Sequence, residues 1–196
     1  SHAITYLPLF SLGVPVVVSC RGAQVNIAPH NPRRSDVRTG LHQIFQQASL
    51  VHCVSQDIQQ EAKTLGLDSA KVRLIYPAID PDFFKPDPNH LDQTGIFRIV
   101  TTGSLIWRKG LEYSLLAVRK LVDAGMPVHF EIIGDGPERN RVLYTIHDLG
   151  LQRQVTLSGK LAPEMVLHRL QQAHVFVLAS LSEGISNAAL EAMACE

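Results

Sequence analysis

Short apolar runs alternate with segments of helical spacing along residues 96–196. The runs predict strands over 97–102, 129–133, 155–157 and 174–180, and the spacing between them predicts helices over 109–123, 137–149 and 163–172. The last run, His174–Ser180, is continuous, which is typical of a strand buried on both faces. A loop over 181–186 and a helix capped by Ser186 or Asn187 follow it. Strands that alternate with helices predict βαβ units and a parallel sheet.

Residues 1–79 show the same alternation in shorter pieces. Strands are predicted over 14–19, 50–55 and 72–75, and helices over 39–48 and 55–65, the second capped by Ser55 and closed by Gly66. Residues 26–38 hold two prolines and three arginines, which predicts a mobile surface loop. A contact with an acceptor or a membrane is the functional alternative for that loop.

The two patterned regions are separated by residues 80–95, which are rich in proline and aspartate and therefore unfavourable to helices. We expect an α/β protein with two Rossmann-like, doubly wound parallel-sheet domains over 1–79 and 96–196, joined by a linker over 80–95. The pattern is interrupted at both ends of the chain. We therefore expect both domains to be incomplete and the 196 residues not to turn over a substrate by themselves.

Composition and residue spacing argue against several classes of function. The formal net charge is zero, which argues against a nucleic-acid partner held by bulk electrostatics. Cys20, Cys53 and Cys195 have no CxxC spacing, so we interpret them as reduced core thiols of a cytosolic protein. The nine histidines lack ligand spacing, and no metal site is predicted. No apolar run reaches the length of a membrane span, and no secretory signal is visible.

Two carboxylates near the end of the chain carry the candidate chemistry. Glu191 is the only polar residue between Ala188 and Cys195, so a helix there would bury a carboxylate that needs hydrogen-bond donors. Glu183 precedes Gly184, which permits close approach of a ligand to the backbone, and the N–H groups at the following helix start suit an anion. Sugar hydroxyls and a phosphate would satisfy both features. The alternative is a solvated Glu183 and a structural ion pair at Glu191.

A second candidate for anion binding is the loop between Gly103 and Gly110. Arg108 and Lys109 stand at the predicted start of a helix, where the helix dipole disfavours cations unless an anion is bound. This placement favours a diphosphate site over a simple surface charge.

Four landmarks in this order resemble the retaining group 1 glycosyltransferases of the GT-B fold. They are GSLIWRKGLEYSLLAV (103–118), GDGP (134–137), LSGKL (157–161) and Glu183-x7-Glu191 within ASLSEGISNAALEAMAC. The resemblance implies a donor-binding domain over 96–196 and an acceptor-side domain over 1–79. It implies transfer of a sugar, with retention, from a UDP- or GDP-sugar to a carbohydrate or lipid-linked acceptor. It implies no metal or other cofactor, and a cytoplasmic protein with peripheral contact at the inner face of a membrane as one option.

The resemblance also implies roles for single residues. Lys109 would bind the diphosphate, Glu183 the hydroxyls of the transferred sugar and Glu191 the ribose diol, with Lys109 and Glu183 as the catalytic pair. The backbone at Lys160 and Leu161 would meet the base. The remaining donor-side residues are Gly103, Ser104, Arg108, Gly184, Ile185 and Ser186.

The chain departs from the family pattern at two positions. Ser104 stands where the family usually has an arginine, for which Arg108 is a candidate substitute. Arg21 precedes Gly22 where many relatives have a histidine, and its acceptor-side role competes with a surface ion pair.

Two other functions compete with sugar transfer. A dinucleotide-binding oxidoreductase predicts a G-x-G-x-x-G turn after the first strand, and neither Gly103-x6-Gly110 nor Gly134-x-Gly136 fits it. A non-catalytic nucleotide-sugar binding or interaction module stays open.

Overall fold

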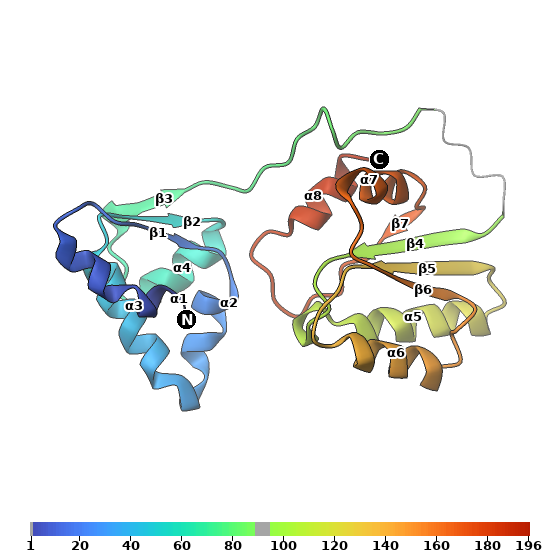
Figure 1. Ribbon diagram of the computed structural model, residues 1–196, viewed down its shortest axis with the longest axis horizontal. Helices are drawn as coiled ribbons and strands as arrows, with labels where there is room; N and C mark the ends of the chain where they lie inside the picture. Colours follow the sequence, from blue (N-terminus) through green and yellow to red (C-terminus); the bar gives the residue numbers. More distant parts are fainter. Residues whose placement is uncertain (1, 89–94) are drawn as a thin grey trace. The chain divides into compact units, whose positions relative to one another are not determined.

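The computed structural model describes residues 2–88 and 95–196, which form two compact units. The first unit comprises Ser1–Pro77 with Ser182–Ile185, and the second comprises Ala78–Leu181 with Ser186–Glu196. Each contains one parallel sheet with helices packed on it (Figure 1). The α/β fold class predicted from the sequence is therefore confirmed.

The first unit is built on a three-stranded parallel sheet in the order β1–β2–β3, where β1 is Val17–Cys20, β2 is Leu50–Cys53 and β3 is Val72–Leu74. Its other elements, in chain order, are α1 His2–Thr5, η1 Leu7–Leu12, α2 Ala23–Asn26, η2 Ala28–His30, η3 Pro32–Arg34, α3 Ser35–Gln47, α4 Gln56–Thr64 and η4 Ser69–Lys71. Helices α3 and α4 bury Ile44, Phe45 and Ile58 against Val51 on one face of the sheet. Helix α4 begins as predicted, because the Ser55 hydroxyl accepts a hydrogen bond from the N–H of Ile58 at 3.2 Å.

The prediction of a loop over 26–38 is wrong. Most of these residues lie in the two 3₁₀ turns η2 and η3 and in the first turn of α3, which begins four residues before the predicted start. The prolines cause this, since each occupies an early position of its 3₁₀ turn, where a missing N–H is tolerated. The carboxamide oxygen of Asn31 also accepts a hydrogen bond from the N–H of Arg33 at 3.0 Å.

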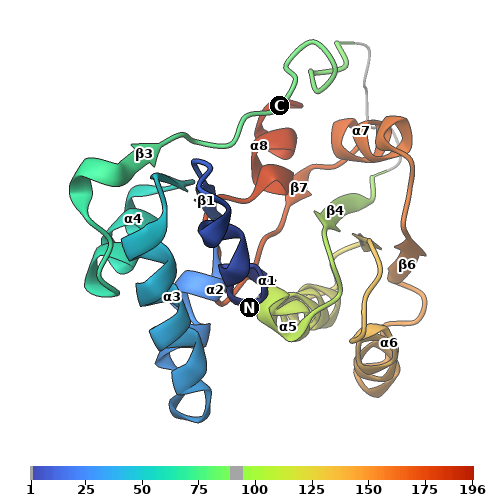
Figure 2. The same ribbon diagram turned by 60° about the vertical axis from the view of Figure 1, so that its left-hand side comes forward.

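The second unit contains a four-stranded parallel sheet in the order β6–β5–β4–β7. Its strands are β4 Phe97–Thr102, β5 Val128–Ile133, β6 Val155–Gly159 and β7 Val175–Phe176. Its helices are η5 Trp107–Lys109, α5 Leu111–Asp123, α6 Arg139–Asp148, α7 Pro163–Gln171 and α8 Asn187–Met193. Helices α5 and α6 cover one face and α7 and α8 the other (Figure 2). Leu115 and Phe130, both fully buried, lie at the centre of the α5–α6 side.

The end of the chain is less buried, within the described residues, than its apolar sequence alone indicates. Among the described strands, β7 lies at the edge of the sheet and pairs with β4 alone, and Val175 on it is exposed. Helix α8 has no buried residue, and its Met193 is exposed. The apolar sequence predicts burial on every side, but within the described residues the contacts reach α8 from the side of α7 and β4.

The predicted linker begins with a turn in which the Asp80 carboxylate accepts hydrogen bonds from the N–H groups of Asp82 and Phe83. Phe84 then packs on the α7–α8 side of the second unit. Residues 89–94 of the predicted linker lie outside the described residues, and the bounds 80–95 stay a prediction.

Candidate functional site

The turns that follow β4 and β5 pack backbone against backbone at the carboxyl edge of the second sheet. The N–H of Gly103 donates to the carbonyl of Ile133 at 2.9 Å, and the N–H of Leu105 donates to that of Asp135 at 3.0 Å. A Cβ added at Gly134 would overlap the carbonyl oxygen of Gly103. Only glycine permits this approach, so the turns 103–110 and 134–137 pack into one compact surface at this edge of the sheet, which we call the ledge.

The predicted cations lie on this ledge, in the turn that leads into α5. Arg108 and Lys109 end the 3₁₀ turn η5, and Gly110, with φ 58°, separates them from α5. The helix predicted from 109 begins at Leu111 with Gly110 as its N-cap, so both cations lie directly before the helix start. The side chain of Lys109 folds back over Gly103, where its Cε would contact an added Cβ at 3.4 Å.

The segment after β7 joins the same ledge. The N–H of Leu181 donates to the carbonyl of Arg108 at 2.8 Å, and a Cβ at Gly110 would overlap the carbonyl oxygen of Ala179. On the other side, the N–H of Gly134 donates to the carbonyl of Gly159 at 2.8 Å, which brings the start of the Lys160–Leu161 turn to the edge. Two of the predicted donor-side stretches, 103–109 and 160–161, therefore meet the 179–181 segment along one line of strand ends.

Glu191 lies on α8 of the same unit and is half-buried. Burial raises the pKa of its carboxyl group. Within residues 2–88 and 95–196 it has neither an ion-pair nor a hydrogen-bond partner, so the structural ion pair considered for it is not formed there. Ser186 occupies the N-cap position of α8, but its side chain makes no capping hydrogen bond.

The residues Ser182–Ile185 belong to the first unit, at the carboxyl ends of β1 and β2. A Cβ on Gly184 would lie 2.9 Å from the carbonyl oxygen of Arg21 and 3.2 Å from Cγ2 of Val54. The side-chain amide of Asn26 donates to the hydroxyl of Ser182 at 3.0 Å. Arg21 and the Glu183–Gly184 loop, which the sequence assigns to different ligands, are therefore neighbours.

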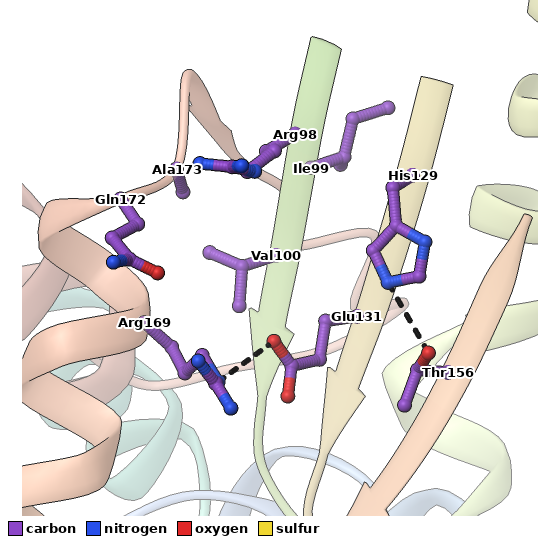
Figure 3. Close-up of a pocket in the computed structure, with 9 residues that line it drawn as sticks. All are labelled: Arg98, Ile99, Val100, His129, Glu131, Thr156, Arg169, Gln172 and Ala173. Carbon is purple, nitrogen blue, oxygen red and sulfur yellow. Dashed lines mark hydrogen bonds and ion pairs between the residues drawn. The ribbon is translucent and has the colours of Figure 1, made fainter. Parts of the chain in front are cut away.

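A polar cavity of about 310 Å³ lies in the second unit, on the sheet face that α7 covers (Figure 3). On its floor the Glu131 carboxylate accepts a hydrogen bond from Ser158 and forms an ion pair with Nε of Arg169 at 3.2 Å. His129 and Thr156 share a hydrogen bond of 3.2 Å along one wall. No predicted donor residue lines this cavity, so it is separate from the ledge.

Neither a metal cluster nor a membrane span is found in the part of the chain that the structure describes. Over these ranges, no three His, Cys, Asp or Glu side chains gather in a way that could hold a metal ion. The helices found in the same ranges are too short or too polar to cross a membrane.

Sequence reasoning named the turn 134–137 as a landmark but not as part of the site. Gly134 and Gly136 both lie where a side chain would meet the backbone of the turn after β4. Their close spacing beside a strand end was the available signal.

Comparison with known proteins identifies two family profiles. The profile "Glycosyl transferases group 1" matches residues 86–196, more than half of the chain, and "Glycosyltransferase Family 4" matches residues 1–83. Among curated relatives, one subunit of the phosphatidylinositol N-acetylglucosaminyltransferase of Homo sapiens is 33% identical over 135 residues, which cover 66% of this chain and 26% of the relative. The putative colanic acid biosynthesis glycosyltransferase WcaL of Escherichia coli is 28% identical over 158 residues, which cover 78% of this chain and 39% of WcaL.

Solved structures share the fold. Anabaena HepE in complex with UDP-glucose superposes with a TM-score of 0.79 at 20% identity, covering 92% of this chain and 51% of HepE. TarM of S. aureus superposes with a TM-score of 0.78 at 15% identity, and the match covers 97% of this chain and 38% of TarM. The chain thus spans about half or less of the length of each of these proteins.

Proposed function

The chain belongs to the group 1 glycosyl transferases, and from this premise we propose that it serves to transfer a sugar from a nucleotide-sugar to an acceptor. The observation that carries the proposal is the ledge at the carboxyl edge of the second sheet, where the 103–110 turn, the start of the 160–161 turn and the 179–181 segment meet. Ligands of parallel α/β sheets bind at this edge.

We propose a UDP-sugar as the donor. HepE binds UDP-glucose, and the pneumococcal O-GlcNAc transferase GtfA, which has a related fold, binds UDP and GlcNAc. GDP, the other diphosphate predicted from the sequence, has no support of this kind. The leaving UDP needs its growing charge stabilised, which fixed cations and N–H dipoles provide.

Each role is assigned by the chemistry of its side chain. Lys109, supported by Arg108, neutralises the diphosphate, with the N–H groups at Gly184 and Ile185 as further donors. Glu183 accepts hydrogen bonds from hydroxyls of the transferred sugar, and Glu191 accepts them from the ribose. The backbone at Lys160–Leu161 meets the uracil. Gly103 and Ser104 complete the ledge against which the diphosphate lies.

Retention at the anomeric carbon and the nature of the acceptor are part of the same proposal. One relative is named for phosphatidylinositol and another for colanic acid biosynthesis, and we propose a lipid-linked or a carbohydrate acceptor accordingly. A lipid-linked acceptor would require peripheral contact with a membrane, and Arg21 is the proposed acceptor-side residue.

Binding of the donor tests this function directly. Thermal unfolding of the chain is followed with UDP-glucose, UDP-GlcNAc, GDP-mannose and uridine, since a ligand that binds the native state raises the melting temperature. We expect stabilisation by a UDP-sugar and none by uridine alone. Stabilisation by no nucleotide-sugar would refute the proposal. Binding without transfer in a version that spans the full length of the relatives would favour the non-catalytic alternative.

Replacement of Lys109 tests the diphosphate role. We expect Lys109→Ala to weaken UDP binding by about 1.5–3 kcal/mol, the value of a hydrogen bond to a charged group. Lys120→Ala is the matched control, because Lys120 is an exposed lysine on α5 of the same unit. Equal UDP affinity in the two variants would show that Lys109 is only a surface lysine.

A further inference from the structure

Cys20 and Cys53 face each other across two neighbouring strands of the first unit. Each is the last residue of its strand, and the two are register partners in the parallel β1–β2 pair. Register partners point to the same face of a sheet, and both side chains are buried in the core beneath the helices. Neighbouring strands lie about 4.7–4.9 Å apart, within the range of about 4.4–6.8 Å between the Cα atoms of a disulfide.

The two thiols differ in their readiness to react. A hydrogen bond from the Cys20 thiol lowers the pKa of the Cys53 thiol, and the nearby Lys63 ammonium lowers it further against the effect of burial. The same hydrogen bond, together with burial and the charge of Cys53, raises the pKa of the Cys20 thiol. Cys53 is therefore the nucleophile of the pair, and Cys20 holds a proton beside it.

We propose that Cys20 and Cys53 form a site of reversible oxidation, at which a hydroperoxide converts the two thiols to a disulfide. The Cys53 thiolate attacks one oxygen of hydrogen peroxide, the O–O bond breaks, and the hydroxide that leaves takes a proton to become water. The Cys20 sulfur then attacks the resulting Cys53 sulfenic acid, the S–O bond breaks, and a second water leaves with the Cys20 proton. Two thiols and one peroxide give one disulfide and two waters, and a dithiol reductant reverses the change.

Buried single thiols are usually inert, and three features distinguish this pair. Both cysteines are the last residues of their strands, where the ladder ends, and hydrogen peroxide is a small oxidant. The second thiol lies on the register partner of the first, so a resolving sulfur stands beside the sulfenic acid. Forming the S–S bond also brings the two sulfurs to about 2 Å from each other, which draws the two strand ends together.

The strand ends that would move support the Glu183 loop. Arg21 and Val54, the residues directly after the two cysteines, are the residues that Gly184 contacts. They are joined through Cys20, whose carbonyl accepts a hydrogen bond from the N–H of Val54 at 3.3 Å. Oxidation therefore shifts the loop that carries Glu183 and lowers affinity for the UDP-sugar, a consequence that rests on the proposed function.

Intact mass tests the oxidation itself, whatever the function. The chain has three cysteines, so Cys195→Ser leaves the pair alone. The folded protein is treated with hydrogen peroxide, quenched with catalase, unfolded and alkylated. We expect the oxidised protein to carry no alkyl group and to weigh two hydrogens less than the reduced, unalkylated protein. After dithiothreitol, both cysteines should be alkylated again. Cys20→Ala and Cys53→Ala should form no intramolecular disulfide. Two alkylated thiols after treatment, or a disulfide that forms only when denaturant is present, would overturn the proposal.

Binding to the oxidised and reduced forms tests the link to the loop. We expect the disulfide to lower UDP-glucose affinity by about tenfold and the Cys20→Ala protein to keep its affinity after peroxide. A disulfide that leaves affinity unchanged overturns the link, while the oxidation site stands on the mass result. A reduced protein that binds no nucleotide-sugar refutes the proposed function and leaves the oxidation test unaffected.

Discussion

Replacing Glu191 with glutamine separates a ligand-binding carboxylate from a structural one. Burial raises the pKa of this carboxyl group, and no partner for it is found in the described part of the chain. Its charge is therefore a disadvantage to the unliganded fold. Glutamine keeps the shape and removes the charge, so we expect the variant to be as stable as the parent at neutral pH or slightly more stable. The gain should not exceed about 1 kcal/mol, because solvent screens a half-exposed group.

The affinity for UDP should change in the opposite direction. A carboxylate that accepts hydrogen bonds from a ribose diol contributes about 1.5–3 kcal/mol, and an amide provides only one acceptor oxygen. We expect Glu191→Gln to weaken UDP binding by roughly 10- to 150-fold. Titration calorimetry with UDP measures this loss. Glu196→Gln is the control, because Glu196 is an exposed glutamate five residues further on.

The dependence of stability on pH gives a second measurement on the same variant. A raised pKa means that the folded state holds the proton more tightly than the unfolded state does. The parent is therefore most stable relative to Glu191→Gln below about pH 4.3, the value for an unfolded glutamate, and loses that advantage as pH rises through the raised folded pKa. Urea unfolding of both proteins at several pH values in this window checks the sign.

One outcome would refute the reasoning on Glu191. A loss of roughly 3–5 kcal/mol in Glu191→Gln is expected if the carboxylate is half of a buried ion pair. Such a loss with unchanged UDP affinity would remove Glu191 from the donor site.

Two further predictions concern the scaffold of the second unit. Gly134→Ala should destabilise the protein by about 3 kcal/mol or more in urea unfolding, because its Cβ meets the Gly103 carbonyl at a φ of 141°. Gly125→Ala, also at positive φ but in open space, should cost only about 1–2 kcal/mol. A double-mutant cycle of Glu131→Gln and Arg169→Met should show coupling of about 1–3 kcal/mol. The expected coupling energy is smaller than that of a fully buried pair, because the Arg169 side chain is 38% exposed. Additive effects of the two substitutions would contradict the ion pair.

The repeating elements of the second unit were predictable because their signal is local. Strand β4 has the predicted bounds, and α5, α6 and α7 differ from their predictions by a few residues at their ends. In each case apolar spacing and a nearby glycine or proline identify the element without knowledge of its neighbours. The same holds for α4, whose first residue follows from the Ser55 cap.

Burial at β7 and α8 depends on which elements pack beside them, and the apolar sequence of the two elements does not specify those neighbours. The apolar sequence is the same for a central strand and for an edge strand, and β7 is an edge strand in the described sheet. The first residue of α5, next to Arg108 and Lys109, was likewise not predictable from the sequence. The left-handed conformation of Gly110 moves the start of α5 past both cations, and a glycine in the sequence does not reveal its φ.

Contacts between distant residues define the parts of the site that sequence reasoning left apart. Arg21 and Gly184 are more than 160 positions apart, yet the Gly184 backbone lies against the Arg21 carbonyl. Cys20 and Cys53 become a pair only through the register of β1 on β2. The positions that make such approaches possible are glycines and strand ends, where the backbone comes close without an intervening side chain. These positions therefore fix how near the charged groups beside them can come to a ligand, and substitutions there test the site as directly as those of Lys109 or Glu191.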